Sequence, residues 1–137
     1  MANILLTGGT GYIGAHTAVV LIESGHNPIL LDNFCNSSPK VAERIEQITG
    51  VLPKVIEMDV LDTDALTEVL KTEQIEAIIH CAALKAVGES VAKPLAYYQN
   101  NVTGTLSVLD AMSRTGVKHI VLSSSATVYG EKGVPPM

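Results

Sequence analysis

The sequence has no tryptophan, a single phenylalanine and only 4% aromatic residues in all. Its 137 residues are still enough to bury about 70% of the unfolded surface in one domain spanning residues 1–137. Since 47% of the residues are hydrophobic, the core must be built from Ile, Leu, Val and Ala. That composition is typical of parallel strands that are buried on both faces.

Long apolar runs and clusters of basic residues are also missing. No apolar run approaches the ~20 residues that span a bilayer, and the N-terminus has neither the basic segment nor the cleavage site of a signal peptide. The net charge is −5, whereas surfaces that bind nucleic acids or anionic membranes need clustered Lys and Arg. We therefore expect a cytoplasmic protein that binds neither nucleic acid nor membrane.

The chain contains two cysteines, Cys35 and Cys81, which are too few for a disulfide framework and lack metal-ligand spacing. Both are expected just after strands that are not neighbours, about 9–10 Å apart. That separation exceeds the ~7 Å Cα limit for a disulfide, so we expect free thiols. No histidine pairs with a Cys or a carboxylate at metal-binding spacing. The sequence predicts no metal site, and His80 is interpreted as a buried strand residue without a role.

Short apolar runs alternate with helical stretches along the chain. Strands are expected over residues 3–7, 28–32, 54–58, 77–80 and 119–123. Helices are expected from 13 to Gly25, from near Pro39 to Gly50, after a cap at Asp62 or Thr63, and from Pro94 to Gly116. Apolar residues mark the last helix at Leu95, Tyr98, Val102, Leu106, Leu109 and Met112. This order predicts an α/β fold, a doubly wound parallel sheet between two helical layers. The sheet would lack a crossover at its C-terminal end, so we expect a fragment.

A glycine-rich loop joins the first strand to the first helix. Gly8, Gly11 and Gly14 give the pattern G-x-x-G-x-x-G. The first glycine permits a tight turn, the second lets the backbone approach a pyrophosphate, and the third lets the helix pack close to the strand. The anion then lies at the positive end of the helix dipole. Because a strand precedes the pattern and an amphipathic helix follows it, we predict a Rossmann-type dinucleotide site.

Asp32 ends the second strand, 18 residues after Gly14, close to the ~20 expected for a carboxylate that accepts the ribose hydroxyls. The same carboxylate repels the extra phosphate of NADP, and no Lys or Arg follows before Lys40, so NAD is favoured as the cofactor. The alternative is a strand-end aspartate that caps a turn. Asp59 follows the third strand, where an adenine would lie, but the sequence alone favours a helix-start role for it.

Four stretches add a resemblance to a known family, namely 32–37 (DNFCNS), 84–90 (LKAVGES), 97–102 (YYQNNV) and 123–130 (SSSATVYG). With the glycine spacing used by extended short-chain dehydrogenases/reductases, the chain resembles the UDP-glucose 4-epimerases over essentially all of its length. The stretch 84–90 differs in sugar-nucleotide dehydratases of the same superfamily. The resemblance implies NAD-dependent interconversion of UDP-glucose and UDP-galactose, by oxidation at C4, rotation of the 4-keto sugar and re-reduction.

The resemblance also implies a role for each residue of the site. The backbone of Tyr12 and Ile13 contacts the pyrophosphate, and Asp59 and Val60 hold the adenine. The adenosine ribose is surrounded by Asp32, Asn33, Phe34, Cys35, Asn36 and Ser37. The rest of the cofactor is lined by Cys81, Ala82, Ala83, Leu84, Lys85 as its cation, Asn100 from the long helix, and Ser123. Ser125 meets the sugar hydroxyl that is oxidised. Outside this context, Lys85 would be an exposed lysine and 123–125 a polar loop.

The base of this superfamily is the tyrosine of a Tyr-x-x-x-Lys pair on a helix, and the pair is absent. Tyr129 has Lys132 three residues on but Gly133 four residues on, and it lies in a loop after the fifth strand. We therefore reject Tyr129 as the base. The pair and the sugar-nucleotide lobe are expected beyond Met137, and the 137-residue chain alone is expected to be inactive.

Three interpretations stay open. The chain is the N-terminal part of an epimerase that acts on a UDP-hexose, a truncated NAD-binding module without turnover, or part of a related dehydratase or reductase. Specificity for a hexose or an N-acetylhexosamine also stays open. The family forms homodimers through the long helix and the catalytic helix, which makes a homodimer the expectation for the full-length protein.

Overall fold

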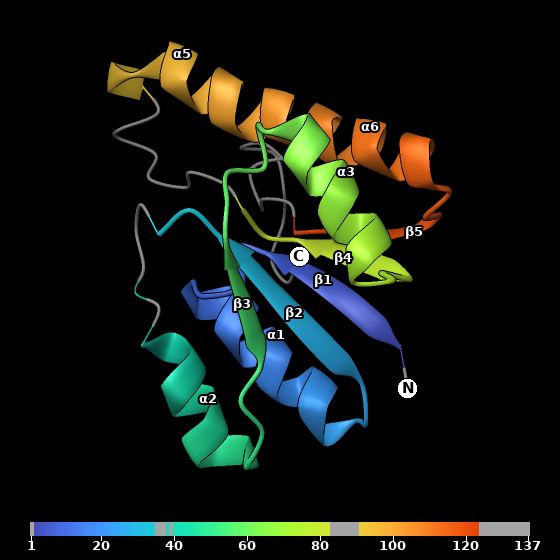
Figure 1. Cartoon of the computed structure of the whole chain (residues 1–137). Helices are drawn as coiled ribbons and strands as arrows, with labels where there is room; N and C mark the ends of the chain where they lie inside the picture. The colour runs from blue at the N-terminus through green and yellow to red at the C-terminus, as the bar shows by residue number, and fades with distance from the viewer. Residues whose placement is uncertain (1, 35–37, 39, 83–90, 124–137) are drawn as a thin grey trace, which may run out of the picture.

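The computed structural model describes residues 2–34, 38, 40–82 and 91–123. Its centre is a sheet of five parallel strands in the order β3-β2-β1-β4-β5 (Figure 1). The strands are β1 (Asn3–Thr7), β2 (Asn27–Asp32), β3 (Lys54–Glu57), β4 (Ala77–His80) and β5 (His119–Leu122). The chain runs outward from β1 to β3 and then returns to the other side of β1. This reversal between β1 and β4 confirms the predicted doubly wound α/β sheet.

Helices cover both faces of the sheet, which gives the predicted three layers (Figure 1). One layer holds α1 (Tyr12–Glu23) and α2 (Val41–Thr49), and the other holds α3 (Thr63–Thr72), α5 (Pro94–Tyr97), η1 (Tyr98–Thr103) and α6 (Gly104–Thr115). Alternate residues of β1 enter opposite cores, because strand side chains point to opposite faces in turn. Leu6 packs with the first layer and Leu5 with the second.

The predicted strands agree with the structure to within one residue at each end. Gly50 and Gly116 end their helices with positive φ values of 78° and 82°, and Gly25 follows α1 with a φ of 85°. The left-handed conformation is accessible to glycine without steric cost. Of the two caps predicted for the third helix, Asp62 is correct, since its side chain accepts a hydrogen bond from the N–H of Ala65. The helix-start role favoured for Asp59 is therefore wrong.

The long helix differs from the prediction in two ways. It is not continuously α-helical, because the six residues of η1 form a π-helical segment between α5 and α6. Most of the apolar residues that marked it in the sequence also lie on its exposed face, and among them only Met112 is buried. The exposed set is Leu95, Tyr98, Val102, Leu106 and Leu109. The buried face of α6 carries smaller residues instead, among them Gly104, Ser107, Val108 and Ala111. None of the described helices is long and apolar enough to cross a membrane.

Candidate cofactor site

The loop between β1 and α1 lies at the edge of the sheet where the strands end. Gly8 has a φ of 67°, and its N–H donates to the carbonyl of Leu31 at 2.7 Å. A Cβ on Gly8 would lie 2.8 Å from the nitrogen of Ala82 and 2.9 Å from the carbonyl carbon of Cys81. Glycine is therefore required here for its conformation and for the close approach of the turn to the end of β4.

The other glycines of the loop are under unequal constraint. A Cβ on Gly14 would lie 2.2 Å from the carbonyl oxygen of Gly8, so only glycine lets α1 begin directly against the turn. A Cβ on Gly9 would lie 2.7 Å from Cγ of Leu30. A Cβ on Gly11 would meet only the oxygen of Gly8, at 3.3 Å, and the φ of Gly11 is an ordinary −74°. Internal packing thus explains Gly8, Gly9 and Gly14 but constrains Gly11 weakly.

The N-terminus of α1 suits an anion. Gly11 is the N-cap and provides no side-chain cap, and the first turn carries no acidic residue. The first backbone N–H groups of a helix have no acceptor within the helix, and the helix dipole adds positive charge there. Tyr12 and Ile13, which occupy this turn, are 78% and 48% exposed. This end of the helix can therefore receive a phosphate group from solvent.

Asp32 ends β2 and braces the glycine loop. Its Oδ2 accepts the N–H of Thr10 at 3.2 Å and the hydroxyl of Thr10 at 2.7 Å. Its Oδ1 accepts the N–H of Phe34 at 2.9 Å, which stabilises Phe34 at a φ of 59°. The sequence presented a capping aspartate and a ribose-binding aspartate as alternatives. A carboxylate offers about four acceptor positions, so these three bonds are compatible with a further one to a ribose hydroxyl.

The turn after β3 lies beside Asp32, because the N–H of Met58 donates to the carbonyl of Asp32 at 3.0 Å. In this turn, Oδ1 of the exposed Asp59 accepts the N–H of Leu61 at 2.9 Å, while Val60 is buried. Two parts of the predicted adenosine site, at the ends of β2 and β3, are thus next to one another.

A buried polar pair, Thr7 and His80, joins the ends of β1 and β4. Oγ1 of Thr7 lies 2.5 Å from Nδ1 of His80 and accepts the N–H groups of Cys81 at 3.1 Å and Ala82 at 3.3 Å. A hydroxyl has one hydrogen and two lone pairs, so its hydrogen is left to donate to Nδ1. His80 is therefore neutral, with its proton on Nε2, and its burial lowers its pKa in agreement with this assignment.

Sequence reasoning missed this pair: His80 is the buried strand residue that was predicted, but its hydrogen bond to Thr7 was not foreseen. The available signal was a polar residue at the end of each of two apolar strands. Thr10 and Ser107 also form hydrogen bonds at this edge of the sheet, but no pattern in the sequence indicated those bonds. Strand order confirms that β2 and β4 are not neighbours, as the free-thiol prediction for Cys35 and Cys81 assumed.

The remaining predicted residues are placed only in part. Ser123 follows β5, and its N–H donates to the carbonyl of His80 at 3.0 Å. Asn100 belongs to η1, on the helical layer that covers β4. Asn33 is exposed just after β2. The residues that lie outside the described part of the chain are Cys35, Asn36, Ser37, Ala83, Leu84, Lys85 and Ser125. Among the described residues, no group of three or more His, Cys, Asp or Glu could hold a metal ion.

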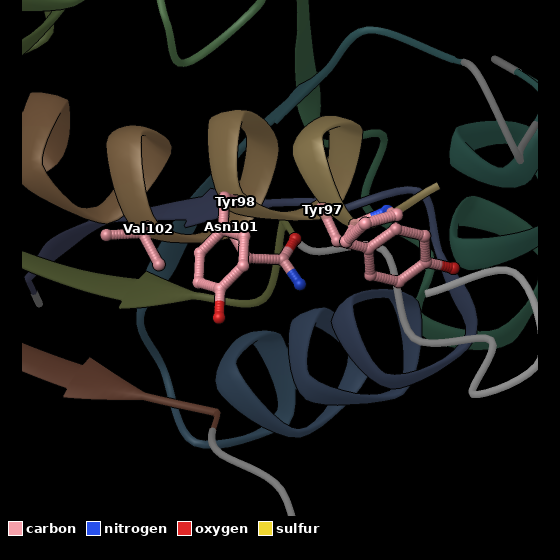
Figure 2. Close-up of a pocket in the computed structure, with 5 residues that line it drawn as sticks. Tyr97, Tyr98, Asn101 and Val102 are labelled. Carbon is pink, nitrogen blue, oxygen red and sulfur yellow. The ribbon is translucent and has the colours of Figure 1, made fainter. Parts of the chain in front are cut away.

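A pocket of about 310 Å³ lies along α5 and η1 (Figure 2). Tyr98 and Asn101 lie next to one another, with Val102 on one side of them and Tyr97 on the other (Figure 2). Pro94 completes the lining.

Comparison with known proteins identifies the family of the chain. The model of the NAD dependent epimerase/dehydratase family matches residues 4–136. The chain belongs to this family. It is 54% identical over 130 residues to a UDP-glucose 4-epimerase of Klebsiella pneumoniae, covering 95% of this chain and 94% of that protein. It is 52% identical over 134 residues to the UDP-glucose 4-epimerase of Pasteurella multocida, covering 98% of this chain and 40% of the relative.

Solved structures agree with the family. A UDP-glucose 4-epimerase from Stenotrophomonas maltophila with bound NAD and formylated UDP-arabinopyranose superimposes with a TM-score of 0.97 at 43% identity, covering 100% of this chain and 41% of that one. The Bifidobacterium longum UDP-glucose 4-epimerase with NAD⁺ and UDP gives 0.94 at 48% identity, covering 98% and 40%. The resemblance and the Rossmann-type fold are confirmed. The chain spans about 40% of the length of these two proteins and of the Pasteurella relative.

Proposed function

We propose that this chain is the NAD-binding part of a UDP-glucose 4-epimerase that acts on UDP-hexoses. The main support is one juxtaposition, in which the open N-terminus of α1 lies beside the Asp32 carboxylate at the edge where the strands end. Thr10, which precedes α1, is bonded to that carboxylate through both its N–H and its hydroxyl. Relatives that superimpose closely on the chain were crystallised with NAD. The donor set fits a dinucleotide: backbone N–H groups for phosphates, and carboxylates for ribose and adenine.

Each part of the edge would hold one part of the cofactor. The N–H groups of Tyr12 and Ile13 would bind the pyrophosphate, Asp32 and its neighbours the adenosine ribose, and Asp59 and Val60 the adenine. The backbone at Cys81 and Ala82, held by the Thr7 hydroxyl, would line the nicotinamide half. The other proposed contacts to the cofactor are those of Ala83, Leu84, Lys85, Asn100 and Ser123. When bound, NAD supplies hydride transfer to and from C4 of the hexose.

Proton transfer at the C4 hydroxyl requires protein side chains in addition to NAD. We propose that Ser125 hydrogen-bonds the C4 oxygen and helps to relay its proton to a base. No tyrosine of the chain has a lysine four residues later, so the base is assigned to a part of the protein outside this sequence.

The exposed stripe of α5, η1 and α6 supports a homodimer. Five large apolar side chains, from Leu95 to Leu109, are between 44% and 69% exposed on one long helical layer. Contiguous apolar surface of this kind marks an interaction site. We also propose that the enzyme acts in nucleotide-sugar metabolism, that galactose is the sugar concerned, and that the protein is cytoplasmic.

Competition between NAD and NADP tests the cofactor assignment. Two like charges about 4 Å apart near a protein surface repel each other by on the order of 4 kcal/mol before screening. Calorimetry should therefore show NAD binding at least about ten-fold more tightly than NADP. Asp32→Asn should reduce that ratio, while Thr10→Val, which leaves the carboxylate in place, should preserve it. Equal affinities of the unmodified protein for both dinucleotides would remove the assignment of Asp32.

A further inference from the structure

We propose that Ser107 and Thr63 are positioning residues that fix the turn at Asp59–Val60 and so shape the adenine subsite. The inference rests on the proposed function, because it assumes that a dinucleotide binds at this edge. Ser107 is on α6, Thr63 is the first residue of α3, and the turn lies between β3 and α3. We call the two hydroxyls the Ser107–Thr63 relay.

The direction of the relay follows from its hydrogen bonds. Oγ of Ser107 donates to the carbonyl oxygen of Val60 in a short hydrogen bond. Oγ1 of Thr63 lies 2.7 Å from Oγ of Ser107. A hydroxyl has one hydrogen, and that of Ser107 is used on Val60, so Thr63 is the donor to Ser107. Because Ser107 and Val60 are both buried, solvent cannot easily replace the bond to the Val60 carbonyl.

The peptide unit between Val60 and Leu61 is held at both ends. Its carbonyl accepts from Ser107, and its N–H donates to Oδ1 of Asp59 at 2.9 Å. Rotation of this peptide would break both bonds together. The relay therefore restrains the Asp59 carboxylate as well, which is the group proposed to accept the adenine amino hydrogen.

Close packing of α6 completes the restraint. Gly104 lies one turn before Ser107, and a Cβ at Gly104 would be 3.2 Å from Cγ2 of Val60. The turn is tied to α3 as well, since the N–H of Asp62 donates to the carbonyl of Asp59 at 3.0 Å. The long helical layer thus reaches the proposed adenine subsite through Val60.

The experiment compares NAD with its hypoxanthine analogue, which has a carbonyl oxygen in place of the adenine amino group. Ser107→Ala in the intact protein should weaken NAD binding about five-fold, the effect expected for one displaced hydrogen-bond partner. The analogue has an acceptor in place of the amino donor proposed to bond Asp59, so its affinity should fall by about two-fold or less. Thr115→Val is the matched control, because its hydroxyl on the same helix bonds only the backbone of α6, and it should change neither affinity.

Each other result decides against a stated claim. Equal losses for both dinucleotides, or no loss, would overturn the positioning role and leave Ser107 as a stabilising residue of the core. Binding of neither dinucleotide by the unmodified protein would instead refute the proposed function. Where Ser107→Ala does not fold, Thr63→Val supplies the test. It keeps the Ser107–Val60 hydrogen bond and removes only the Thr63 hydroxyl that donates to Ser107. An unchanged ratio of NAD to analogue affinity in Thr63→Val would also overturn the relay.

Discussion

Alanine substitutions at Gly11 and Gly14 separate two physical reasons for a glycine in one loop. At Gly14, a Cβ would lie 2.2 Å from the Gly8 oxygen, whereas real Cβ contacts essentially never fall below 3.0 Å. The helix or the turn must therefore move by at least 3.0 − 2.2 = 0.8 Å. At Gly11, the same atom would be met at 3.3 Å, so a shift of a few tenths of an ångström is enough.

The expected costs differ accordingly. Movement of Gly8 disturbs its 2.7 Å bond to Leu31 and its contact with Ala82. Overpacking of this kind costs about 1–3 kcal/mol, and we expect Gly14→Ala to lose about 2 kcal/mol or more of its free energy of unfolding. Gly11→Ala replaces glycine by alanine at a helix N-cap, which costs less than about 1 kcal/mol. Its methyl group would nevertheless hold a pyrophosphate away from the helix N-terminus, and we expect NAD affinity to fall about ten-fold or more.

Two measurements on each variant test this reasoning. Thermal unfolding without ligand should show a decrease on the order of 8 °C for Gly14→Ala and little change for Gly11→Ala, and calorimetry with NAD should show the affinity loss in Gly11→Ala. Gly116→Ala is the control, because it strains a positive φ at the far end of α6 where nothing lies within 4 Å. It should lower stability and leave NAD affinity unchanged. Unaltered NAD binding in Gly11→Ala, or an unaltered melting temperature in Gly14→Ala, would refute the argument.

Two further predictions concern His80 and Ser125. The pKa of His80 is lowered below 6.5 by burial, so the unfolded chain binds more protons than the native state between the two pKa values. Stability should thus be constant above about pH 7.5 and be lost as the pH falls through 6.5 towards the native pKa, with a slope of at most about 1.4 kcal/mol per pH unit. Urea titrations should show this loss reduced in His80→Asn, and identical pH profiles would contradict the neutral-histidine assignment. Ser125→Ala in the full-length enzyme should lower kcat and kcat/KM together by about ten-fold or more with NAD content and Tm unchanged, and near-normal kcat would leave Ser125 as scaffolding.

Local patterns were enough to predict the sheet. Each strand is a short apolar run between turn residues, and the glycines at 25, 50 and 116 mark helix ends by a conformation that few other residues adopt. The glycine loop was predictable for the same reason, because its constraints come from residues near one another in the chain or on the adjacent strands. Periodicity also located the long helix correctly. It could not tell which face is buried, because an apolar stripe on an exposed face has the same period as one that packs into the core.

The polar contacts of the edge could not be predicted, because they join residues far apart in the sequence. Thr63 and Ser107 are 44 positions apart, and Thr7 and His80 are 73 apart. No spacing rule relates such pairs before the strand order is known. The π-helical segment also could not be predicted from a pattern with a period of 3.6. Its six residues include no proline or glycine that would mark the extra residue in the helix.

The unequal constraint on the glycines bears on function as well as on folding. Gly8, Gly9 and Gly14 are explained by atoms of the chain itself, so their presence would be expected in any domain with this turn. Gly11 is not explained in this way, because its φ is ordinary and its surroundings would admit a methyl group with a small adjustment. It also occupies the N-cap position, where Ser, Thr, Asp or Asn would stabilise α1 by accepting a free N–H. Gly11 gives α1 no side-chain cap, although packing does not require a glycine there, so the free N–H groups of the first turn are left for an external acceptor. This is the strongest argument from the protein alone that a phosphate binds at the N-terminus of α1.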